Sequence, residues 1–356
     1  MTIQSGRIDV HHHLIPPAFI SAMERHGIRE VAGAPLPRWK IEDTIAIMDV
    51  CSTQTAILSL SAPGVYFGDI EEAVALARRC NEFSALLTEQ HPGRIGYFAV
   101  LPMPFTQYAC AEAIHALDNL NAAGIVLLGS TEGKFLGDPQ FDELMAELDR
   151  RKTVVFVHPN LHETSKNIGL DIPGFLMEFL CDTTRAALNL VLSGTMERYP
   201  NIRWILAHAG GFLPYIAWRL SLANMMAPYN TTAPQGVLTY IKRFYFDTAL
   251  SPSPYALGAL RELVEPSHIL FGSDFPFAPA IASGMQVKAL QANTQFDEKT
   301  RYGINRGHAL SLFPQYKSGN EVVTALPVYG PESLGNRVRR MLIKPVVTLA
   351  DHIRGK

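Results

Sequence analysis

The sequence has few cysteines and no block of positive charge. The four cysteines are Cys51, Cys80, Cys110 and Cys181. They are too widely spaced to indicate a disulfide framework or a CxxC zinc motif. Charged residues make up only 18% of the 356 residues, and the formal net charge is −2. A nucleic-acid or membrane-surface binder would need a basic cluster. We therefore expect a small-molecule partner and a reducing compartment.

Long apolar runs are also missing. No uninterrupted apolar stretch approaches the roughly 18 residues of a membrane span. The N-terminus lacks the apolar core of a secretory signal peptide. Since 47% of the residues are nonetheless hydrophobic, the chain can bury a large core. The sequence predicts a compact cytoplasmic protein that neither enters nor crosses a membrane.

Short apolar runs recur along the chain and indicate eight buried strands. The runs are Arg7–His11, Thr55–Leu60, Ile95–Leu101, Gly124–Leu128, Thr153–His158, Ile202–His208, Arg243–Thr248 and His268–Gly272. They are continuous rather than alternating, which is typical of parallel strands buried on both faces. Amphipathic helical patterns separate them, for example over Asp69–Glu89 and Asp138–Arg151. An open doubly wound sheet would need an early glycine-rich phosphate loop, so the pattern favours a (β/α)₈ TIM barrel.

Two segments depart from the barrel pattern, which we assign to residues 1–313. Residues 14–43 contain four prolines, and we expect a loop-helix insertion there, after the first strand and over the barrel mouth. Residues 314–356 form a C-terminal extension of unknown role, with a basic helix near Asn336–Lys344.

Polar side chains follow several predicted strands at the point where each strand ends. They are His11, His13, His158, His208 and Asp274. In a barrel these ends meet at one face, where active sites are built. Because side chains alternate along a strand, His11 and His13 share one side, and His12 points away. Imidazoles combined with a carboxylate suit one divalent metal, Zn²⁺ first and Mn²⁺ or Fe²⁺ as alternatives.

Four motifs at these strand ends resemble the amidohydrolase superfamily. They read DVHHH at residues 9–13, VHP at 157–159, AHAGG at 207–211 and GSDFP at 272–276. The closest branch is the decarboxylases typified by aminocarboxymuconate semialdehyde decarboxylase, and the likeness covers roughly residues 7–313. The resemblance implies a TIM barrel with one metal and no organic cofactor. Its implied ligands are His11, His13, His158 and Asp274, with His208 beside the metal.

The fourth predicted strand lacks a lysine. Residues 124–129 read GIVLLG, whereas the superfamily's binuclear hydrolases carry a carboxylated lysine there. The resemblance therefore favours the single-metal decarboxylases. A mononuclear hydrolase of a lactone or amide stays open as an alternative, because one metal can also activate water.

Arg219 is the candidate for holding a substrate carboxylate, since guanidinium matches carboxylate geometry. It lies eleven residues beyond His208, where the semialdehyde decarboxylase has an arginine delivered from a neighbouring subunit. The likeness implies a homodimer in which Arg219 crosses to the other site. Thr44 stands where that enzyme has a second arginine, and this difference argues against a dicarboxylate substrate.

Three further segments, residues 134–139, 246–251 and 275–277, are similar to 6-methylsalicylate decarboxylases. This likeness implies metal-dependent, non-oxidative decarboxylation of an ortho-hydroxy aromatic acid, with 6-methylsalicylate giving 3-methylphenol and CO₂. A nearby acid would protonate the ring carbon that bears the carboxylate; we favour Asp274, with His208 as the alternative. We expect an apolar wall for the ring from Trp39, Phe67, Phe275 and Phe277.

Overall fold

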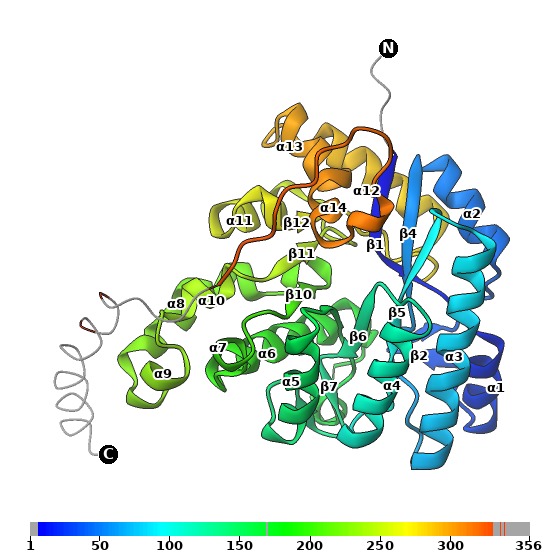
Figure 1. Ribbon diagram of the computed structural model, residues 1–356, viewed down its shortest axis with the longest axis horizontal. Coiled ribbons are helices and arrows are strands. Elements are labelled where there is room, and N and C mark those ends of the chain that lie inside the picture. Colours follow the sequence, from blue (N-terminus) through cyan, green and yellow to red (C-terminus); the bar gives the residue numbers. More distant parts are fainter. Residues whose placement is uncertain (1–5, 169, 330–334, 336–337, 339–356) are drawn as a thin grey trace.

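Eight parallel strands follow one another around a barrel in their chain order (Figure 1). The computed structural model describes residues 6–168, 170–329, 335 and 338. The barrel strands are β1 (Arg7–His13), β4 (Thr53–Ser59), β5 (Ile95–Val100), β6 (Gly124–Leu128), β9 (Val154–His158), β10 (Arg203–Leu206), β11 (Tyr245–Asp247) and β12 (Ile269–Leu270). All eight predicted strands are present, and the TIM barrel is confirmed.

The barrel closes between β12 and β1. The backbone N–H of Val10 donates to the carbonyl of Phe271 at 3.0 Å, and that of Asp274 donates to the carbonyl of His11 at 2.8 Å. The closing contact therefore joins the two segments that carry predicted metal ligands, although they are far apart in sequence.

Helices surround the barrel. They are α1 (Pro17–Arg25), α2 (Ile41–Val50), α3 (Ile70–Gln90), α4 (Thr106–Asp118), α5 (Asp142–Arg150), α6 (Glu178–Leu192), α7 (Thr195–Arg198), α8 (Leu213–Ser221), α9 (Ala227–Thr232), α10 (Val237–Ile241), α11 (Pro254–Leu263), α12 (Ala280–Ala292), α13 (Glu298–Tyr302) and α14 (His308–Leu312). Helix α3 begins as predicted, because the Asp69 carboxylate caps it by accepting from the N–H of Glu72.

The helix predicted over residues 138–151 is interrupted. Asp138 caps a short 3₁₀ turn, Pro139–Phe141, before α5 starts.

Alternation along the strands divides the core into two layers. Phe98 and Phe156 stack on each other with ring centroids 5.5 Å apart, and Phe156 also contacts the ring of His11 at 4.9 Å. Their strand neighbours Tyr97 and Val157 belong to the other buried cluster, which packs against the helices. The inner layer therefore supports the predicted site directly.

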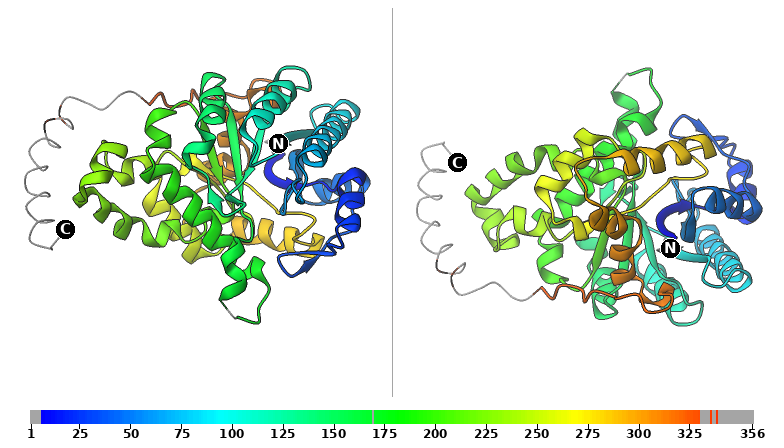
Figure 2. Two further views of the ribbon diagram at one scale, coloured as in Figure 1. Left: turned by 90° about the horizontal axis from the view of Figure 1, so that it is seen from below. Right: turned by 90° about the horizontal axis from the view of Figure 1, so that it is seen from above.

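The segment predicted as an insertion contains α1 and a short antiparallel ribbon, β2 (Glu30–Val31) and β3 (Ala34–Pro35). This ribbon touches the long connection between β9 and α6, where the N–H of Phe175 donates to the carbonyl of Ala32 at 3.1 Å. The connection projects from the body of the barrel, as the green segment in Figure 2 shows. A second ribbon, β7 (Ser130–Thr131) and β8 (Lys134–Phe135), follows β6.

The described first part of the C-terminal extension, up to residue 329, runs back along the barrel after α14 (Figure 1). Arg306, which is 0% exposed, anchors it by donating through Nε and Nη2 to the Glu321 carboxylate at 2.5 and 2.8 Å. The basic helix predicted near residues 336–344 falls almost wholly outside the described residues. Within the part of the chain that is described, no helix is long and apolar enough to cross a membrane.

Candidate metal centre

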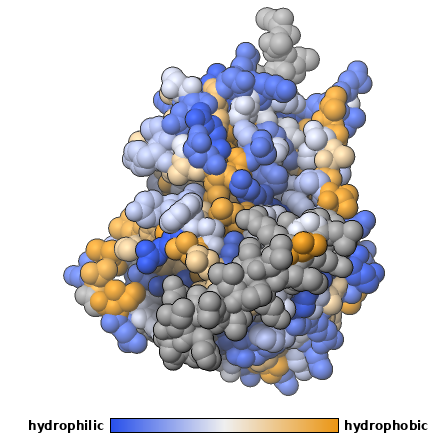
Figure 3. Space-filling model, turned by 90° about the vertical axis from the view of Figure 1, so that its left-hand side faces the viewer, coloured by the Kyte–Doolittle hydropathy of each residue, from blue (hydrophilic) through white to orange (hydrophobic). Residues whose placement is uncertain are grey.

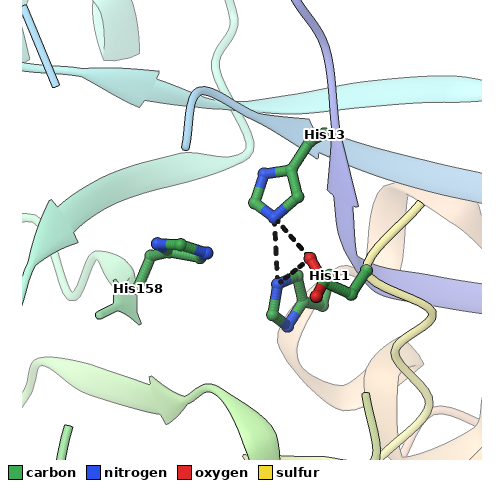
Figure 4. A group of neighbouring side chains, drawn as sticks. His11, His13 and His158 are labelled. Carbon is green, nitrogen blue, oxygen red and sulfur yellow. Dashed lines mark hydrogen bonds and ion pairs between the residues drawn. The ribbon is translucent and has the colours of Figure 1, made fainter. Parts of the chain in front are cut away.

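Four predicted ligands converge at the C-terminal end of the barrel (Figure 4). His11 and His13 come from β1, His158 ends β9, and Asp274 follows β12. One ligand atom from each lies within 4.8 Å of all the others, and all four residues are buried. The Nε2 atoms of His11 and His13 are 3.0 Å apart, and Oδ1 of Asp274 lies 3.2 and 3.0 Å from them.

Each imidazole uses Nδ1 to hydrogen-bond an oxygen behind it. The pairs are His11 with the Asp247 carboxylate at 2.7 Å, His13 with the Ser59 carbonyl at 3.1 Å and His158 with the Pro159 carbonyl at 2.8 Å. Since these oxygens accept from Nδ1–H, the three Nε2 atoms are directed into the cluster. Metal-binding histidines are oriented in this way.

Burial and charge set the protonation of these groups. Burial lowers the pKa of His13 and takes that of His158 well below its usual value, so both rings are neutral at neutral pH. Burial also opposes charge on His11, but the Asp247 and Asp274 carboxylates outweigh it and raise the pKa of His11 to about 10. Burial would raise the pKa of Asp274, yet the charge on His11 holds it well below the usual value. His11 therefore carries a proton in the metal-free site, and a divalent cation would have to displace that proton in order to bind.

The donor set fits one divalent cation. Zn–N bonds of about 2.0–2.1 Å place two ligands of a tetrahedral zinc ion roughly 3.3 Å apart, close to the 3.0 and 3.2 Å separations around His11 Nε2. Strand β6, whose residues are GIVLL, contributes no lysine that could bridge a second ion. Among the described residues this is the only group of three or more histidine, cysteine, aspartate or glutamate side chains that is arranged to hold a metal.

His208 lies beside the cluster, just after β10. Its Nε2 is 3.5 Å from Oδ2 of Asp274, the carboxylate oxygen that faces away from His11 and His13. The side chain is buried, and its Nδ1 has no hydrogen-bond partner in the described part of the chain. Both His208 and Asp274 have left-handed backbones, with φ of 55° and 61°. Such strain in non-glycine residues is typical of functional sites.

Asp247 is a site residue that the sequence analysis missed. It ends β11, is fully buried, and contacts the His11 ring through Oδ2. Its Oδ1 accepts from the backbone N–H groups of His208 and Ala249, both at 2.9 Å. Asp247 therefore connects a candidate ligand to the loop that carries His208. The sequence does contain the pattern that could have identified it, because Asp247 is a carboxylate at the C-terminal end of a predicted strand, like Asp274.

Asp247→Asn is expected to weaken metal binding about 10–100-fold, the usual cost of losing an oriented carboxylate behind a metal-binding histidine. A competition titration against a chelator measures the affinity. Asp142→Asn is the control, because Asp142 pairs with Arg198 on the surface. Equal affinity in Asp247→Asn and the wild type would show that this carboxylate does not support the site.

His12 turns away from the cluster, as strand alternation predicts. Its Nδ1 lies 3.1 Å from Oδ2 of Asp9, and its Nε2 lies 3.2 Å from the hydroxyl of Thr44. The indole N–H of Trp39 also donates to that hydroxyl, at 2.9 Å. Thr44 is fully buried among these groups. Position 44 thus faces the back of β1, away from the cluster.

The predicted aromatic contacts separate into two groups. The Phe277 ring lies 5.3 Å from that of His13, at the edge of the cluster, and Phe275 packs on His12 at 5.2 Å. Phe67 instead stacks on His26, just after α1, at 4.9 Å. Trp39 likewise makes its contacts behind β1. The structure therefore brings Phe277 to the cluster, and places Phe67 and Trp39 against the insertion and helices.

A cleft lies at the ends of β5 and β6. It has apolar lining from residues such as Val65, Met103 and Leu128, and polar groups from Tyr66 and Asn160. Leu128 is the strand partner of His158, but none of the four candidate ligands lines the cleft. The sequence analysis missed it because its walls come from several separate loops and strands.

Comparisons with known proteins agree with this geometry. The Amidohydrolase family profile matches residues 8–314. The 6-methylsalicylic acid decarboxylase of Penicillium expansum is 37% identical over 318 residues, spanning 88% of this chain and 97% of that protein. A solved amidohydrolase II structure is 32% identical with a TM-score of 0.82, covering 86% of this chain and 99% of that one. The 5-carboxyvanillate decarboxylase of Novosphingobium aromaticivorans, complexed with manganese, is 21% identical with a TM-score of 0.78, covering 88% and 97%. The chain belongs to the amidohydrolase family.

Proposed function

We propose that this protein is a metal-dependent, non-oxidative decarboxylase of an ortho-hydroxy aromatic acid, with 6-methylsalicylate as substrate and 3-methylphenol and CO₂ as products. The observation that carries the proposal is the placement of Asp274. One of its oxygens faces the Nε2 atoms of His11 and His13, and the other faces His208. This arrangement combines a cation site with a group that can handle a proton. The similarity to the Penicillium enzyme supports the choice of reaction and substrate.

The proposed metal ligands are His11, His13, His158 and Asp274, which fit one cation. When bound, that cation would draw charge from the substrate's carboxylate and hydroxyl oxygens and hold them in place. We propose Zn²⁺, which this nitrogen-rich donor set suits. Mn²⁺ is the alternative, since the Novosphingobium protein holds manganese. Elemental analysis of the purified protein decides between the two metals. A finding of stoichiometric manganese would contradict the proposal that the metal is zinc.

Proton transfer is assigned to Asp274 and His208. Because the pKa of Asp274 lies well below its usual value, this residue rests as a carboxylate. His208, 3.5 Å from Oδ2, is placed to supply it with a proton. Asp274 then passes that proton to the ring carbon bearing the carboxylate. The bond to the carboxylate breaks, its electron pair restores the aromatic ring, and CO₂ leaves, so the electrons balance without an oxidant or organic cofactor.

The site also favours this chemistry because it excludes water. His208 and the four candidate ligands are all buried, and so is the Asp247 carboxylate behind them. Hydrogen bonds and charges act more strongly in such surroundings than in water. We assign Phe277 to the wall against the substrate ring. Trp39 and Phe67 stay predictions.

We propose a homodimer in which Arg219 of one subunit reaches the site of the other. Helix α8 carries Arg219 at its exposed surface, together with Tyr215 and Trp218, which are 87% and 73% exposed. Figure 3 faces the side of the molecule where α8 and α9 lie, and hydrophobic groups reach the surface there. Exposed aromatic side chains in one cluster indicate a protein contact.

Arg219→Gln is expected to raise the KM for the substrate about 10–100-fold, the effect of losing a charge-assisted hydrogen bond. Steady-state kinetics measure it. Arg198→Gln, which alters an exposed arginine paired with Asp142, is the matched control. If both variants keep the wild-type KM, Arg219 does not bind the substrate.

A substrate panel tests the proposed function. Metal-loaded protein is incubated with 6-methylsalicylate, salicylate and 3-hydroxybenzoate, and CO₂ is measured. We expect release from the two ortho-hydroxy acids, faster from 6-methylsalicylate, and none from 3-hydroxybenzoate. No CO₂ from any of them, combined with hydrolysis of an aryl lactone, would identify a hydrolase instead.

A further inference from the structure

The floor of the barrel, at the end opposite the metal centre, carries two buried arginines. Arg203 begins β10 and is 8% exposed, and Arg243 lies two residues before β11 and is 6% exposed. In the pairing of β10 with β11, Ile205 lies beside Tyr245. The two arginines, each two positions earlier, are therefore neighbours at the N-terminal ends of adjacent strands. Among the ion pairs formed within residues 6–168 and 170–329, neither arginine takes part.

Each guanidinium is anchored through one nitrogen, and three further nitrogens of the pair make no hydrogen bond within the described part of the chain. Nη2 of Arg203 donates to the carbonyl of Pro327 at 2.7 Å, and Nη2 of Arg243 donates to Oε1 of Gln235 at 2.8 Å. Nη1 of Arg203 and both Nε and Nη1 of Arg243 are buried and make no hydrogen bond with the described residues. Buried polar groups are nearly always satisfied in folded proteins, so these N–H groups indicate a ligand with several acceptor oxygens.

The described surroundings offset this positive charge only in part, because one carboxylate, Glu197, acts on Arg243. Burial lowers the pKa of Arg243, and the charge of Arg203 lowers it further. The Glu197 carboxylate acts on Arg243 from a distance and raises its pKa, but it forms no ion pair with either arginine within the described residues; its Oε2 accepts from the hydroxyl of Tyr240 at 2.7 Å. His268 faces the same region and is neutral at neutral pH, because burial lowers its pKa to about 4, and its Nε2 has no hydrogen-bond partner among the residues that the structure describes. The region therefore holds two guanidinium groups against one more distant carboxylate, together with nitrogen atoms that make no hydrogen bond among the described residues.

The C-terminal extension covers the arginine pair. The Tyr329 ring centroid lies 5.0 Å from Cζ of Arg203 and 4.6 Å from Cζ of Arg243. The extension is held nearby by the carbonyl of Pro327 and further back by the Arg306–Glu321 pair. A tyrosine ring attracts cations through its π face but carries no net charge. Tyr329 therefore lies over both guanidinium groups without adding a negative charge to pair with them.

We propose that Arg203 and Arg243 form a binding site for a small dianionic oxyanion of the phosphate type, with Tyr329 as its cover. Two guanidinium groups balance the charge of a dianion, and their planar N–H pairs match phosphate oxygens. A carboxylate offers similar oxygens with half the charge, so it is the weaker ligand. The site lies on the opposite face from the proposed decarboxylase chemistry and does not depend on it.

Thermal unfolding of the full-length, metal-loaded protein tests this site. Melting is followed in inorganic phosphate, acetate and chloride at equal ionic strength. Phosphate is expected to raise the Tm in a saturable manner, with a smaller effect from acetate. The Arg203→Gln and Arg243→Gln variants are expected to lose this increase, while Arg198→Gln, an exposed control, keeps it. A larger shift with acetate than with phosphate would overturn the phosphate assignment.

Two further measurements separate this site from the alternatives. Line broadening of the ³¹P signal of phosphate reports binding directly, even if a variant melts at a lower temperature; we expect it with wild type and not with Arg203→Gln. The His13→Ala variant should retain phosphate binding, since its change is at the other end of the barrel. Loss of binding in His13→Ala, or equal binding in wild type and both arginine variants, would refute the floor site.

Discussion

Asp274→Asn is expected to keep most of its metal while losing roughly 10³-fold or more in kcat, within the range of about 10²–10⁴ for removal of a general acid. The amide oxygen can still face His11 and His13, but the side chain can no longer carry a proton to the substrate ring. Asparagine also tolerates the left-handed backbone at this position, where φ is 61°. Metal content and steady-state decarboxylation, measured on the same preparation, test both parts.

Asp142→Asn serves as the control for this change, because it removes an exposed carboxylate far from the cluster. It should leave kcat and metal content unchanged. If Asp274→Asn kept more than about a tenth of the wild-type kcat, a loss too small for a general acid, the ring proton would have to come from another group. His208, the other proton-handling residue of the site, would then be the acid.

His11→Ala is expected to abolish decarboxylation through loss of the metal. His11 contacts the other candidate ligands with Nε2 and holds the buried Asp247 carboxylate with Nδ1. Its removal takes away a ligand and leaves a buried carboxylate without its partner, which is costly. Metal analysis should find little metal per chain, and activity should lie below detection even with added metal.

His12→Ala is a closely matched control for that variant. His12 is the next residue and is also buried, but its ring bonds to Asp9 and Thr44 behind β1. We expect a less stable protein that still binds one metal. Metal loss in His12→Ala equal to that in His11→Ala would mean that disruption of β1, rather than loss of a ligand, explains both results.

Much of the fold could be predicted from continuous apolar runs. The run Val154–Val157 is buried on both sides within β9, between the inner layer and the helices. Short ribbons such as β2–β3 were not predicted, because two-residue strands carry no periodic signal. The 3₁₀ turn before α5 was also missed, since Pro139 can occupy the first turn of either kind of helix.

The site was predictable where it depends on strand ends and unpredictable where it depends on loops. His11, His158 and Asp274 were brought together by the rule that parallel strands in a barrel end at one face. Phe67 could not be placed in this way, because it lies in a loop whose path is set by packing against the insertion. The floor arginines were missed for a different reason. They begin strands, and their importance depends on Tyr329 from the far end of the chain.

The measurement that bears most directly on the proposed reaction is the fate of 6-methylsalicylate in D₂O. Ring protonation followed by loss of CO₂ requires 3-methylphenol with one deuterium at the carbon between the hydroxyl and methyl groups, and one CO₂ for each molecule of product. Mass spectrometry and NMR of the product test both requirements. Unchanged 6-methylsalicylate after prolonged incubation with metal-loaded protein, or product without deuterium at that carbon, would contradict decarboxylation by the site built around Asp274.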